Sequence, residues 1–462
     1  MRLKHTTLTT LAFLAALGAL PGCDDDDDER DAGVDAGRVV VPDAGAGATI
    51  AALAAERPEL SMLVAAATRA NLGDELSAAG PLTLFAPTNQ AFAASGITMD
   101  DIDAMSDEEL TRVLTYHLIE GVELLADDIT SGPVLTAADL TLFVNEVDGA
   151  VTLNGGNTVT GGANVTSADI DASNGVIHAI DRVLLPPDVP TLATYGGLTT
   201  LATAIGQAGL TDDLTESGQL TVFAPTNDAF AALPALPTGD ALEAALLYHV
   251  LDRELTAGAL AVLDPPQAAA LVANRFGDPL VVVFDTADGA RVNDAAVIEP
   301  DLRATNGIVH VIDRVLVAPN VLQMAELLGL TAFVGAVEGA AGVDGTSLAD
   351  ALLADQPLTV FAPTNEAFAA IEATLATLTP EQVRDVLLFH VLDPATFPTP
   401  VLAGELPAGT TPLDTLLGED AVLVTTTTPP TIEGARIVRT DVTVLNGVIH
   451  VIDAVMIPPS FE

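Results

Sequence analysis

Three near-identical stretches decide the fold of this chain: TLFAPTNQAF at Thr83–Phe92, TVFAPTNDAF at Thr221–Phe230 and TVFAPTNEAF at Thr359–Phe368. Their first phenylalanines, Phe85, Phe223 and Phe361, are spaced 138 residues apart. Solenoid repeats are about 20–50 residues long, whereas about 100–150 residues make a whole domain. The spacing therefore predicts one domain fold that is used three times within 462 residues.

A second repeated block follows each of these stretches: NGVIHAIDRVL at Asn174–Leu184, NGIVHVIDRVL at Asn306–Leu316 and NGVIHVIDAV at Asn446–Val455. Asn-Gly favours a tight type I′ turn, so each block predicts the second half of a hairpin. In the strand that follows, Ile308 and Ile312 share one face with His310, while Val309 and Val311 share the other. Both faces are largely apolar, which predicts an interior strand that is covered on two sides.

Between the two blocks, each repeat carries an amphipathic helix that ends in histidine. Capping boxes at Ser106–Glu109 and Thr379–Gln382 mark helix starts. His117, His249 and His390 each continue an apolar stripe at helical spacing. We expect these histidines, and His178, His310 and His450 of the strand block, to be neutral, buried and hydrogen-bonded to the backbone. Tyr116 is rotated about 100° from the stripe, which predicts a place at its edge.

Domain boundaries are predicted after each strand block, at Pro186-Pro187-Asp188 and at Ala318-Pro319-Asn320. The expected domains are 48–188, 189–320 and 321–462. Each is expected to open with helical sequence, over 50–76 in the first and 322–337 in the third. Strand blocks and helices alternate without a regular βαβ rhythm, which favours an α+β fold: a small β-sandwich with helices beside it.

The composition excludes several classes of function. Asp and Glu number 64 against 16 Lys and Arg, a net charge of −48, and such a surface repels nucleic acid. Lys4 is the only lysine, so the chain beyond the leader offers no P-loop or Schiff-base chemistry. The sequence contains no GxSxG or HExxH motif. Asp169–Ser173 begins like a calcium loop, but Gly falls at the seventh position and Ile180 stands where Glu is needed. We therefore predict no enzyme, no cofactor and no metal site.

The N-terminus has the pattern of an export signal. Arg2 and Lys4 precede the apolar run Leu8–Leu20, and Leu-Pro-Gly-Cys ends it in the manner of a bacterial lipobox. We expect a lipoprotein signal peptide over 1–22 and a lipid on Cys23, the only cysteine. Residues 23–47 are acidic and Gly-rich, which predicts a disordered tether. The protein is thus expected to be exported and held to the cell envelope by its lipid alone, with its domains extracytoplasmic.

The two blocks and the aromatic-His pair between them resemble the fasciclin (FAS1) domain family, in three tandem copies over roughly 48–460. The resemblance implies an α+β wedge, a two-sheet sandwich flanked by helices, that serves cell adhesion and matrix or surface binding without catalysis. A surface or matrix protein or a polysaccharide would be its partner. In some animal members the Tyr-His region is linked to receptor binding, which singles out Tyr116 and His117, Tyr248 and His249, and Phe389 and His390. The alternative is a structural spacer or small-ligand-binding envelope lipoprotein without an adhesive partner.

Overall fold

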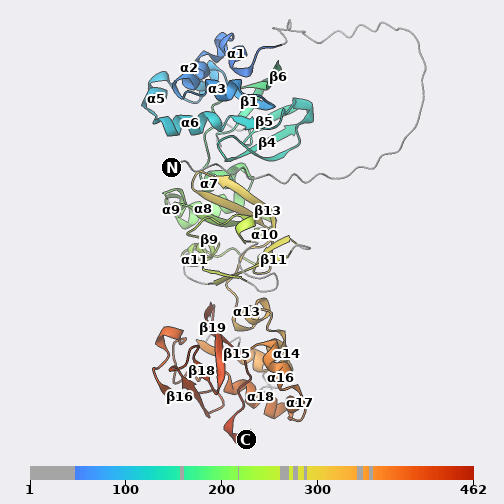
Figure 1. The fold of residues 1–462 in the computed structure, drawn as a ribbon, viewed down its shortest axis with the longest axis vertical. Helices are drawn as coiled ribbons and strands as arrows, with labels where there is room; N and C mark the ends of the chain where they lie inside the picture. The colour runs from blue at the N-terminus through green and yellow to red at the C-terminus, as the bar shows by residue number, and fades with distance from the viewer. Residues whose placement is uncertain are drawn as a thin grey trace, which may run out of the picture. The chain divides into compact units, whose positions relative to one another are not determined.

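The computed structural model describes residues 47–156, 161–216, 218–260, 270–273, 279–285, 289–340, 347–352 and 357–461. The expected signal peptide, Cys23 and nearly all of the expected tether lie outside these residues. The described elements form three sets with a common order (Figure 1). We call them domain 1, with elements from Ile50 to Ile180, domain 2, from Val189 to Ile312, and domain 3, from Val321 to Phe461. The segment after each closing strand is counted with the domain that it leaves.

Domain 1 has its helices at α1 (Ile50–Ala55), α2 (Ser61–Arg69), α3 (Gly73–Ser77), α4 (Asn89–Ala94), α5 (Met99–Ala104) and α6 (Asp107–Thr115), with 3-10 turns at η1 (Pro58–Leu60) and η2 (Ala126–Asp128). Its strands are β1 (Leu82–Pro87), β2 (Leu118–Glu120), β3 (Gly132–Leu135), β4 (Thr141–Val147), β5 (Ala150–Leu153), β6 (Ala163–Ala172) and β7 (Gly175–Ile180).

Domain 2 follows this order without a helix in the place of α5, and its helices are α7 (Val189–Tyr195), α8 (Thr199–Ala208), α9 (Thr211–Glu216), α10 (Asn227–Ala231), α11 (Asp240–Tyr248) and α12 (Ala257–Leu260). Its strands are β8 (Leu220–Pro225), β9 (Val250–Leu251), β10 (Ala270–Ala273), β11 (Pro279–Asp285), β12 (Gly289–Val292), β13 (Ala295–Ala304) and β14 (Gly307–Ile312).

Domain 3 has helices α13 (Val321–Leu327), α14 (Thr331–Gly339), α15 (Leu348–Leu352), α16 (Asn365–Ala370), α17 (Glu372–Leu375) and α18 (Pro380–Phe389), with turns η4 (Ala403–Glu405) and η5 (Pro459–Phe461). Its strands are β15 (Leu358–Pro363), β16 (Thr410–Asp414), β17 (Asp420–Val424), β18 (Thr431–Ile432), β19 (Ala435–Val444) and β20 (Gly447–Ile452).

Each domain is built on one curled sheet. The strand order is β2-β1-β7-β6-β5-β4-β3 in domain 1, and domain 2 repeats it as β9-β8-β14-β13-β12-β11-β10. Domain 3 has the six-stranded order β15-β20-β19-β18-β17-β16, and an isolated bridge between Val360 and Val391 stands in the place of β2. β1 and β7 are parallel, with Phe85 beside His178, and the neighbouring pairs are antiparallel. The long β6 pairs with β7 through two register shifts and with β5 only at its start, so it carries the sheet from one layer to the other.

The curled sheet gives each domain two hydrophobic cores. In domain 1, Leu84, Leu110 and Ile177 pack beneath the helices, whereas Phe85 and Leu142 pack inside the curled sheet. Neighbouring residues of a strand point to opposite faces, so β1 feeds both cores. All six residues of β7 are buried, which confirms the interior strand that the sequence predicts. In Figure 1 the helices of domain 1 lie beside the strands. The fold class is thus α+β, with a curled sheet and helices against one face.

The repeated Phe-Ala-Pro-Thr-Asn stretch joins a strand to a helix. β1 ends at Pro87, and the hydroxyl of Thr88 caps α4 by accepting a hydrogen bond from the N–H of Ala91 at 3.1 Å. The Asn89 amide turns instead to the start of α2, where its oxygen accepts from the N–H of Met62 at 3.0 Å. Asn227 and Asn365 hold the corresponding helices of domains 2 and 3 in the same way.

The Asn-Gly hairpin forms, but not as a type I′ turn centred on Asn-Gly. Ala172 pairs with Gly175, so Ser173 and Asn174 are the turn residues and Gly175 begins the strand. The Asn174 side chain accepts from the N–H of Ile50 at 2.8 Å and also donates to the end of α3, which ties two helices to the sheet. Gly175 has φ +147°, and a Cβ there would overlap the carbonyl oxygen of Leu82. Close backbone approach, and not turn chemistry, requires this glycine.

The continuous helical stretches expected at the start of domains 1 and 3 are broken. Residues 50–76 divide into α1, η1, α2 and α3, because Pro58 has no N–H to continue a helix and Asn71 adopts a positive φ of 57°. Gly329, with φ 72°, likewise separates α13 from α14 within 322–337. The capping boxes predicted for α6 and α18 are both formed.

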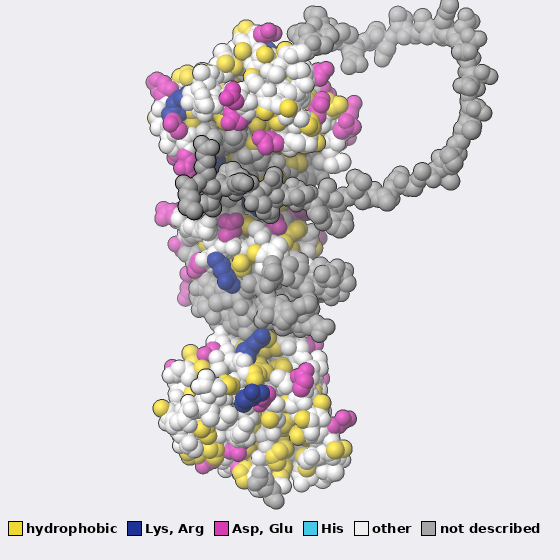
Figure 2. Space-filling view, viewed as in Figure 1, with side chains coloured by type: hydrophobic (Ala, Val, Ile, Leu, Met, Phe, Trp, Pro, Cys, Tyr) yellow, Lys and Arg dark blue, Asp and Glu magenta, His cyan; other side chains and the backbone are white. Residues whose placement is uncertain are grey.

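Acidic side chains are scattered over the visible face of the described residues, with few basic ones between them (Figure 2). The net charge of −48 therefore comes from the folded domains as well as from the acidic stretch that follows Cys23. None of the helices in the described parts of the chain has the length and apolar character needed to span a bilayer.

Candidate functional site

The helix-end histidine of domain 1 connects two segments through its ring. Its Nδ1–H donates to the carbonyl oxygen of Val113 at 2.7 Å, which satisfies one of the last carbonyls of α6. Its Nε2 accepts from the N–H of Leu184, in the segment that leaves β7, at 2.9 Å. Both ring nitrogens of His117 are therefore engaged, and these bonds fix the Nδ1–H tautomer.

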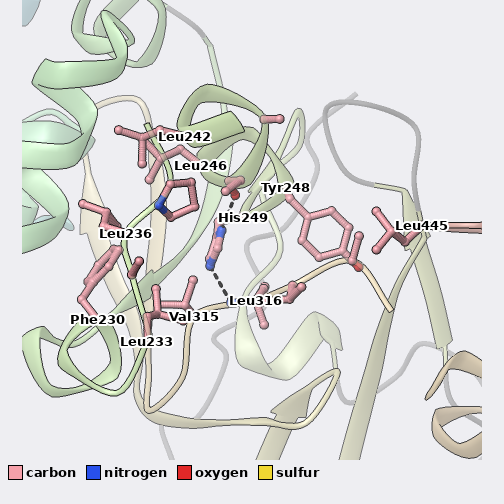
Figure 3. A pocket seen from close by; sticks show the side chains of 16 residues that line it. Phe230, Leu233, Leu236, Leu242, Leu246, Tyr248, His249, Val315, Leu316 and Leu445 are labelled. Atoms are coloured by element: carbon pink, nitrogen blue, oxygen red, sulfur yellow. Dashed lines mark hydrogen bonds between the residues drawn. The ribbon is translucent and has the colours of Figure 1, made fainter. Parts of the chain in front are cut away.

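Domains 2 and 3 repeat this arrangement. His249 donates to Ala245 at 2.7 Å and accepts from Leu316 at 2.8 Å (Figure 3), while His390 donates to Val386 at 2.7 Å and accepts from Met456 at 3.0 Å. The backbone of each histidine also accepts a hydrogen bond from the FAPTN strand, as Phe85 donates to the His117 carbonyl at 2.9 Å. Each histidine thus joins a helix end, a strand and the segment that follows the last strand of its domain, which we call the exit segment.

Burial keeps these three imidazoles neutral. Burial lowers the pKa of His117 from 6.5 to about 4, against a smaller opposing effect of the hydrogen bond to Val113. The pKa values of His249 and His390 are lowered to about 4 for the same reason. The rings therefore carry no charge near neutral pH, as the sequence predicts, and they serve as fixed hydrogen-bond bridges.

Tyr116 does not lie at the edge of the helical stripe, and that expectation is wrong. The side chain is fully buried in the core inside the curled sheet, where rotation away from the stripe takes it. Its hydroxyl donates to the carbonyl oxygen of Thr141 at 2.8 Å and accepts from the Asn154 amide at 3.2 Å. Tyr248 accepts from Asn293 at 3.2 Å in the same manner. Burial raises the pKa of Tyr116, so the phenol stays protonated.

Domain 3 replaces both members of this bond. Phe389 is fully buried where the tyrosines stand, and Glu433 occupies the place of Asn154 and Asn293 at the end of the short hairpin strand. Asn154 and Glu433 each adopt a positive φ, at 50° and 47°. Glu433 is less buried than the asparagines and uses its carboxylate to accept from the N–H of Val422. The phenol and its buried amide partner are thus lost together.

The strand histidines form a second repeated bridge. His178 donates through Nε2–H to the carbonyl of Leu124 at 2.7 Å, and its Nδ1 accepts from the N–H of Asp169 at 3.3 Å. His310 and His450 bond to Asp301 and Asp441 in the same way. Each ring stacks on the FAPTN phenylalanine, with centroids 5.4 Å apart for Phe85 and His178. Burial lowers the pKa of all three strand histidines.

Sequence reasoning missed the bulge aspartates that hold these rings. Asp169, Asp301 and Asp441 adopt positive φ values of 56°, 58° and 57°, and each carboxylate accepts a hydrogen bond from a backbone N–H, such as that of Ala126 at 2.8 Å. Their signal was present in the sequence: each stands nine residues before its histidine. The same aspartate opens the stretch that resembles a calcium loop, and here it acts as a bulge residue. Asp181, three residues after His178, accepts a hydrogen bond from the backbone N–H of Asn164 at 2.7 Å.

The six aromatic and histidine side chains that the resemblance singles out are therefore internal. All are less than a tenth exposed. They would affect a partner bound at the surface through the helix end and the segment after the last strand, which they hold together. Among the described residues, no group of three or more His, Cys, Asp or Glu side chains is placed to hold a metal ion.

The family model described as "Fasciclin domain" matches this chain three times, over residues 58–186, 196–318 and 329–458. Synechocystis protein sll1483 is 44% identical over 141 residues, which are 30% of this chain and 74% of that protein. The porcine transforming growth factor-beta-induced protein ig-h3 is 28% identical over 411 residues, and human periostin is 29% identical over 315.

These alignments cover 86% and 64% of this chain but only 56% of ig-h3 and 35% of periostin. The chain thus spans about half or less of the length of these two animal relatives. The three family matches nevertheless take up most of the sequence and coincide with the three domains of the structure. This chain belongs to the fasciclin domain family and carries three copies of its domain.

Proposed function

We propose that this protein is a cell-surface or envelope-anchored adhesion or matrix-binding protein that acts through its three FAS1 domains without catalysis. FAS1 relatives such as ig-h3, periostin and the fasciclin-like proteins are adhesion-related, and FAS1 proteins are mainly non-catalytic. Since the chain spans only part of the animal relatives, their partners are not carried over.

One observation supports this proposal most: the same buried arrangement of histidines occurs in all three domains, and the histidine side chains are engaged in hydrogen bonds inside the protein. The histidines of all three domains bond to backbone groups through both ring nitrogens. Three copies in one chain are suited to multivalent binding, because linked sites of weak individual affinity give a much higher overall affinity. The outward-facing surfaces, and not a reaction centre, then carry the function.

The anchor and the partner are part of the same proposal. The lipobox-like Leu-Pro-Gly-Cys and the acidic stretch after it support a lipid on Cys23 and a tether that holds the domains away from the membrane, outside the cytoplasm. The acidic surface disfavours nucleic acid and anionic lipid as partners. It suits a neutral or cationic surface or matrix protein, or a polysaccharide.

Attachment of cells tests the adhesive role. Cells that lack the gene should attach less to a surface coated with their own extracellular matrix, and the full chain should restore attachment. Cys23→Ala should fail to restore it, because the domains would no longer be held at the envelope. Normal attachment of the deletion cells would favour the spacer or ligand-binding alternative.

The intact mass of the protein purified from the envelope fraction tests the anchor separately. It should correspond to a chain that begins at Cys23 and bears a lipid. An unmodified chain that begins elsewhere would remove the lipid anchor from the proposal while leaving the adhesive role to be judged by attachment.

A further inference from the structure

An apolar pocket of about 530 Å³ opens beside His249, and all of its lining residues except Leu445 belong to domain 2. Its walls include Phe230 of α10, Leu242 and Ala245 of α11, Leu236 of the segment between these helices, and Val315 of the exit segment. Figure 3 shows Phe230, Leu233 and Leu236 on one side of the imidazole, with Leu242 and Leu246 across from Val315. The volume falls within the range of about 300–1,000 Å³ that is typical of small-molecule sites.

Domain 1 has the same place in its fold, but there it is filled. Phe92, Leu110, Val113, His117 and Val183 are the counterparts of the domain 2 residues, and the space among them is only about 10 Å³. Ile102 and Met105, from α5 and the residue after it, reach into this space. Ile102 is only 1% exposed. In domain 1, therefore, this place is occupied by apolar side chains, the branched Ile102 and the unbranched Met105.

The difference follows from the segment that precedes the histidine helix. Residues 95–106 of domain 1 carry α5, whereas the shorter 232–239 of domain 2 contain Pro234 and Pro237 and form no helix. This segment supplies wall residues of the pocket without filling it. Ala245 also stands where domain 1 has Val113, which widens the space further.

The lining leaves little for a polar ligand to bind. His249 uses both ring nitrogens on backbone groups, and the Tyr248 hydroxyl is bonded to Asn293. None of the residues that line this described pocket is an Asp, Glu, Lys or Arg. The acidic residues of α11, Asp240 and Glu243, are exposed and would repel an anionic headgroup. A buried polar group of a ligand would therefore lack a partner, which is costly.

The mouth of the pocket exposes apolar side chains. Leu236 is 37% exposed and Val317 is 65% exposed, and both line the pocket. Exposed apolar side chains that line one pocket mark a binding site more often than single apolar residues scattered over the surface do.

We propose that domain 2 binds a neutral, largely aliphatic small molecule in this pocket, at the place that α5 fills in domain 1. Entry lies past the exposed Leu236. The ligand stabilises the site by burying apolar surface, because the walls offer no open hydrogen-bonding group. This site does not depend on the adhesive role, so either can fail without the other.

Titration of the full processed chain with the neutral fluorophore Nile red tests the site. We expect saturable binding of about one molecule per chain, which 1-decanol displaces about ten-fold more readily than decanoate because the carboxylate finds no cation. Ala245→Leu places extra atoms in the pocket and should weaken binding by about ten-fold or more. Ala241→Leu is the matched control, since it adds the same atoms to an exposed position of the same helix.

A second variant, Leu236→Asp, keeps the test valid if Ala245→Leu does not fold. Leu236→Asp alters an exposed residue at the mouth and should also weaken binding by about ten-fold, with an unchanged melting temperature. Absence of saturable binding to the unaltered chain, or equal binding to the Ala245→Leu and Ala241→Leu chains, overturns the proposal. Concentration-dependent self-association that Ala245→Leu abolishes, without Nile red binding, would show that a second copy occupies the pocket and would likewise overturn it.

Discussion

Domains 1 and 2 hold the same imidazole in the same two hydrogen bonds, yet they differ in what lies beside it. In domain 1, α5 brings Ile102 against the wall that His117 helps to form, and about 10 Å³ remains. In domain 2, residues 232–239 pass over the corresponding wall and leave about 530 Å³ beside His249. The bonds of the two histidines agree within 0.1 Å.

This comparison separates the frame of the fold from its variable part. Three contacts of domain 1 have counterparts in the other two domains: the hydrogen bonds of the helix-end histidine, the hydrogen bond from the first helix to the Asn174 side chain, and the stacking of Phe85 on His178. They hold together the strands, the helix end and the segment after the last strand. The segment before the histidine helix has no role in these bonds. It can therefore shorten and lose its helix without loss of the frame, and a pocket results.

The largest expected effect is that of removing the domain 1 bridge. His117→Ala leaves the Val113 carbonyl and the Leu184 N–H buried without their partner, and at about 1–3 kcal/mol for each group domain 1 should lose about 4 kcal/mol of stability. His249→Ala should cost domain 2 less, because water in the open pocket can reach the freed groups. Hydrogen exchange of peptides from each domain, measured on the full chain, gives the two losses separately.

Equal losses in the two domains would contradict the comparison, since they would mean that the pocket of domain 2 is closed to water. Thr115→Ala is a suitable reference change in domain 1. Thr115 is the last residue of α6, next to Tyr116, and its hydroxyl bonds within its own helix, to the carbonyls of Thr111 at 2.7 Å and Arg112 at 3.3 Å.

The filling side chain itself should matter in domain 1 and not in domain 2. Ile102→Ala removes a buried side chain from a close-packed place and should cost domain 1 about 3 kcal/mol. Leu236→Ala, in the corresponding segment of domain 2, should stay within about 0.5 kcal/mol because its side chain is already exposed. Denaturant unfolding followed by exchange of domain-specific peptides measures both. A large loss with Leu236→Ala would show that the segment closes over the pocket in solution.

Acid should act on both domains alike, because the histidine bridge is common to them. The pKa values of His117 and His249 are lowered from 6.5 to about 4, so only the unfolded chain takes up protons between these values. Stability is therefore complete above pH 6.5 and falls as the pH drops toward 4, by about 2 kcal/mol per domain at pH 5 from this histidine. Exchange rates at pH 7 and pH 5, corrected for intrinsic chemistry, test this. Stability that is flat over this range would show that the rings are accessible to protons.

The sequence predicts the frame well because the frame repeats. The two blocks, the capping boxes of α6 and α18, the interior strand β7 and the buried neutral histidines are all confirmed. Each of these depends on local chemistry or on alternation along one element. The breaks at Pro58 and Gly329 were visible in the sequence as well, but an apolar pattern that continued across them concealed them.

Contacts between distant segments were the part that sequence patterns could not supply. The Asn174 turn was assigned to the wrong residues because Gly175 is required by β1, which lies far away along the chain. Tyr116 was placed at the edge of one core because a helical wheel does not show the second core on its other side. The pocket of domain 2 exists because residues 232–239 leave space beside His249, and the spacing of apolar residues along a sequence does not predict empty space between elements.

The smallest expected effect concerns the phenol that domains 1 and 2 share and domain 3 lacks. From the sequence alone, Tyr116→Phe should barely change stability, because Phe389 stands at this position in domain 3. The structure predicts otherwise. The change leaves the buried Asn154 amide and the Thr141 carbonyl without the hydroxyl, and should cost domain 1 about 1–2 kcal/mol.

A double change separates these two predictions. Domain 3 tolerates Phe389 because Glu433, which has no amide donor, replaces the asparagine and accepts from Val422. Asn154→Glu should therefore recover part of the loss when Tyr116→Phe is already present, although it should be harmful alone because it removes the donor to the phenol. Exchange of domain 1 peptides in the four chains of this cycle gives the coupling energy between the two positions. Additive losses would mean that the phenol and the amide act independently, and that the joint replacement in domain 3 has no energetic basis.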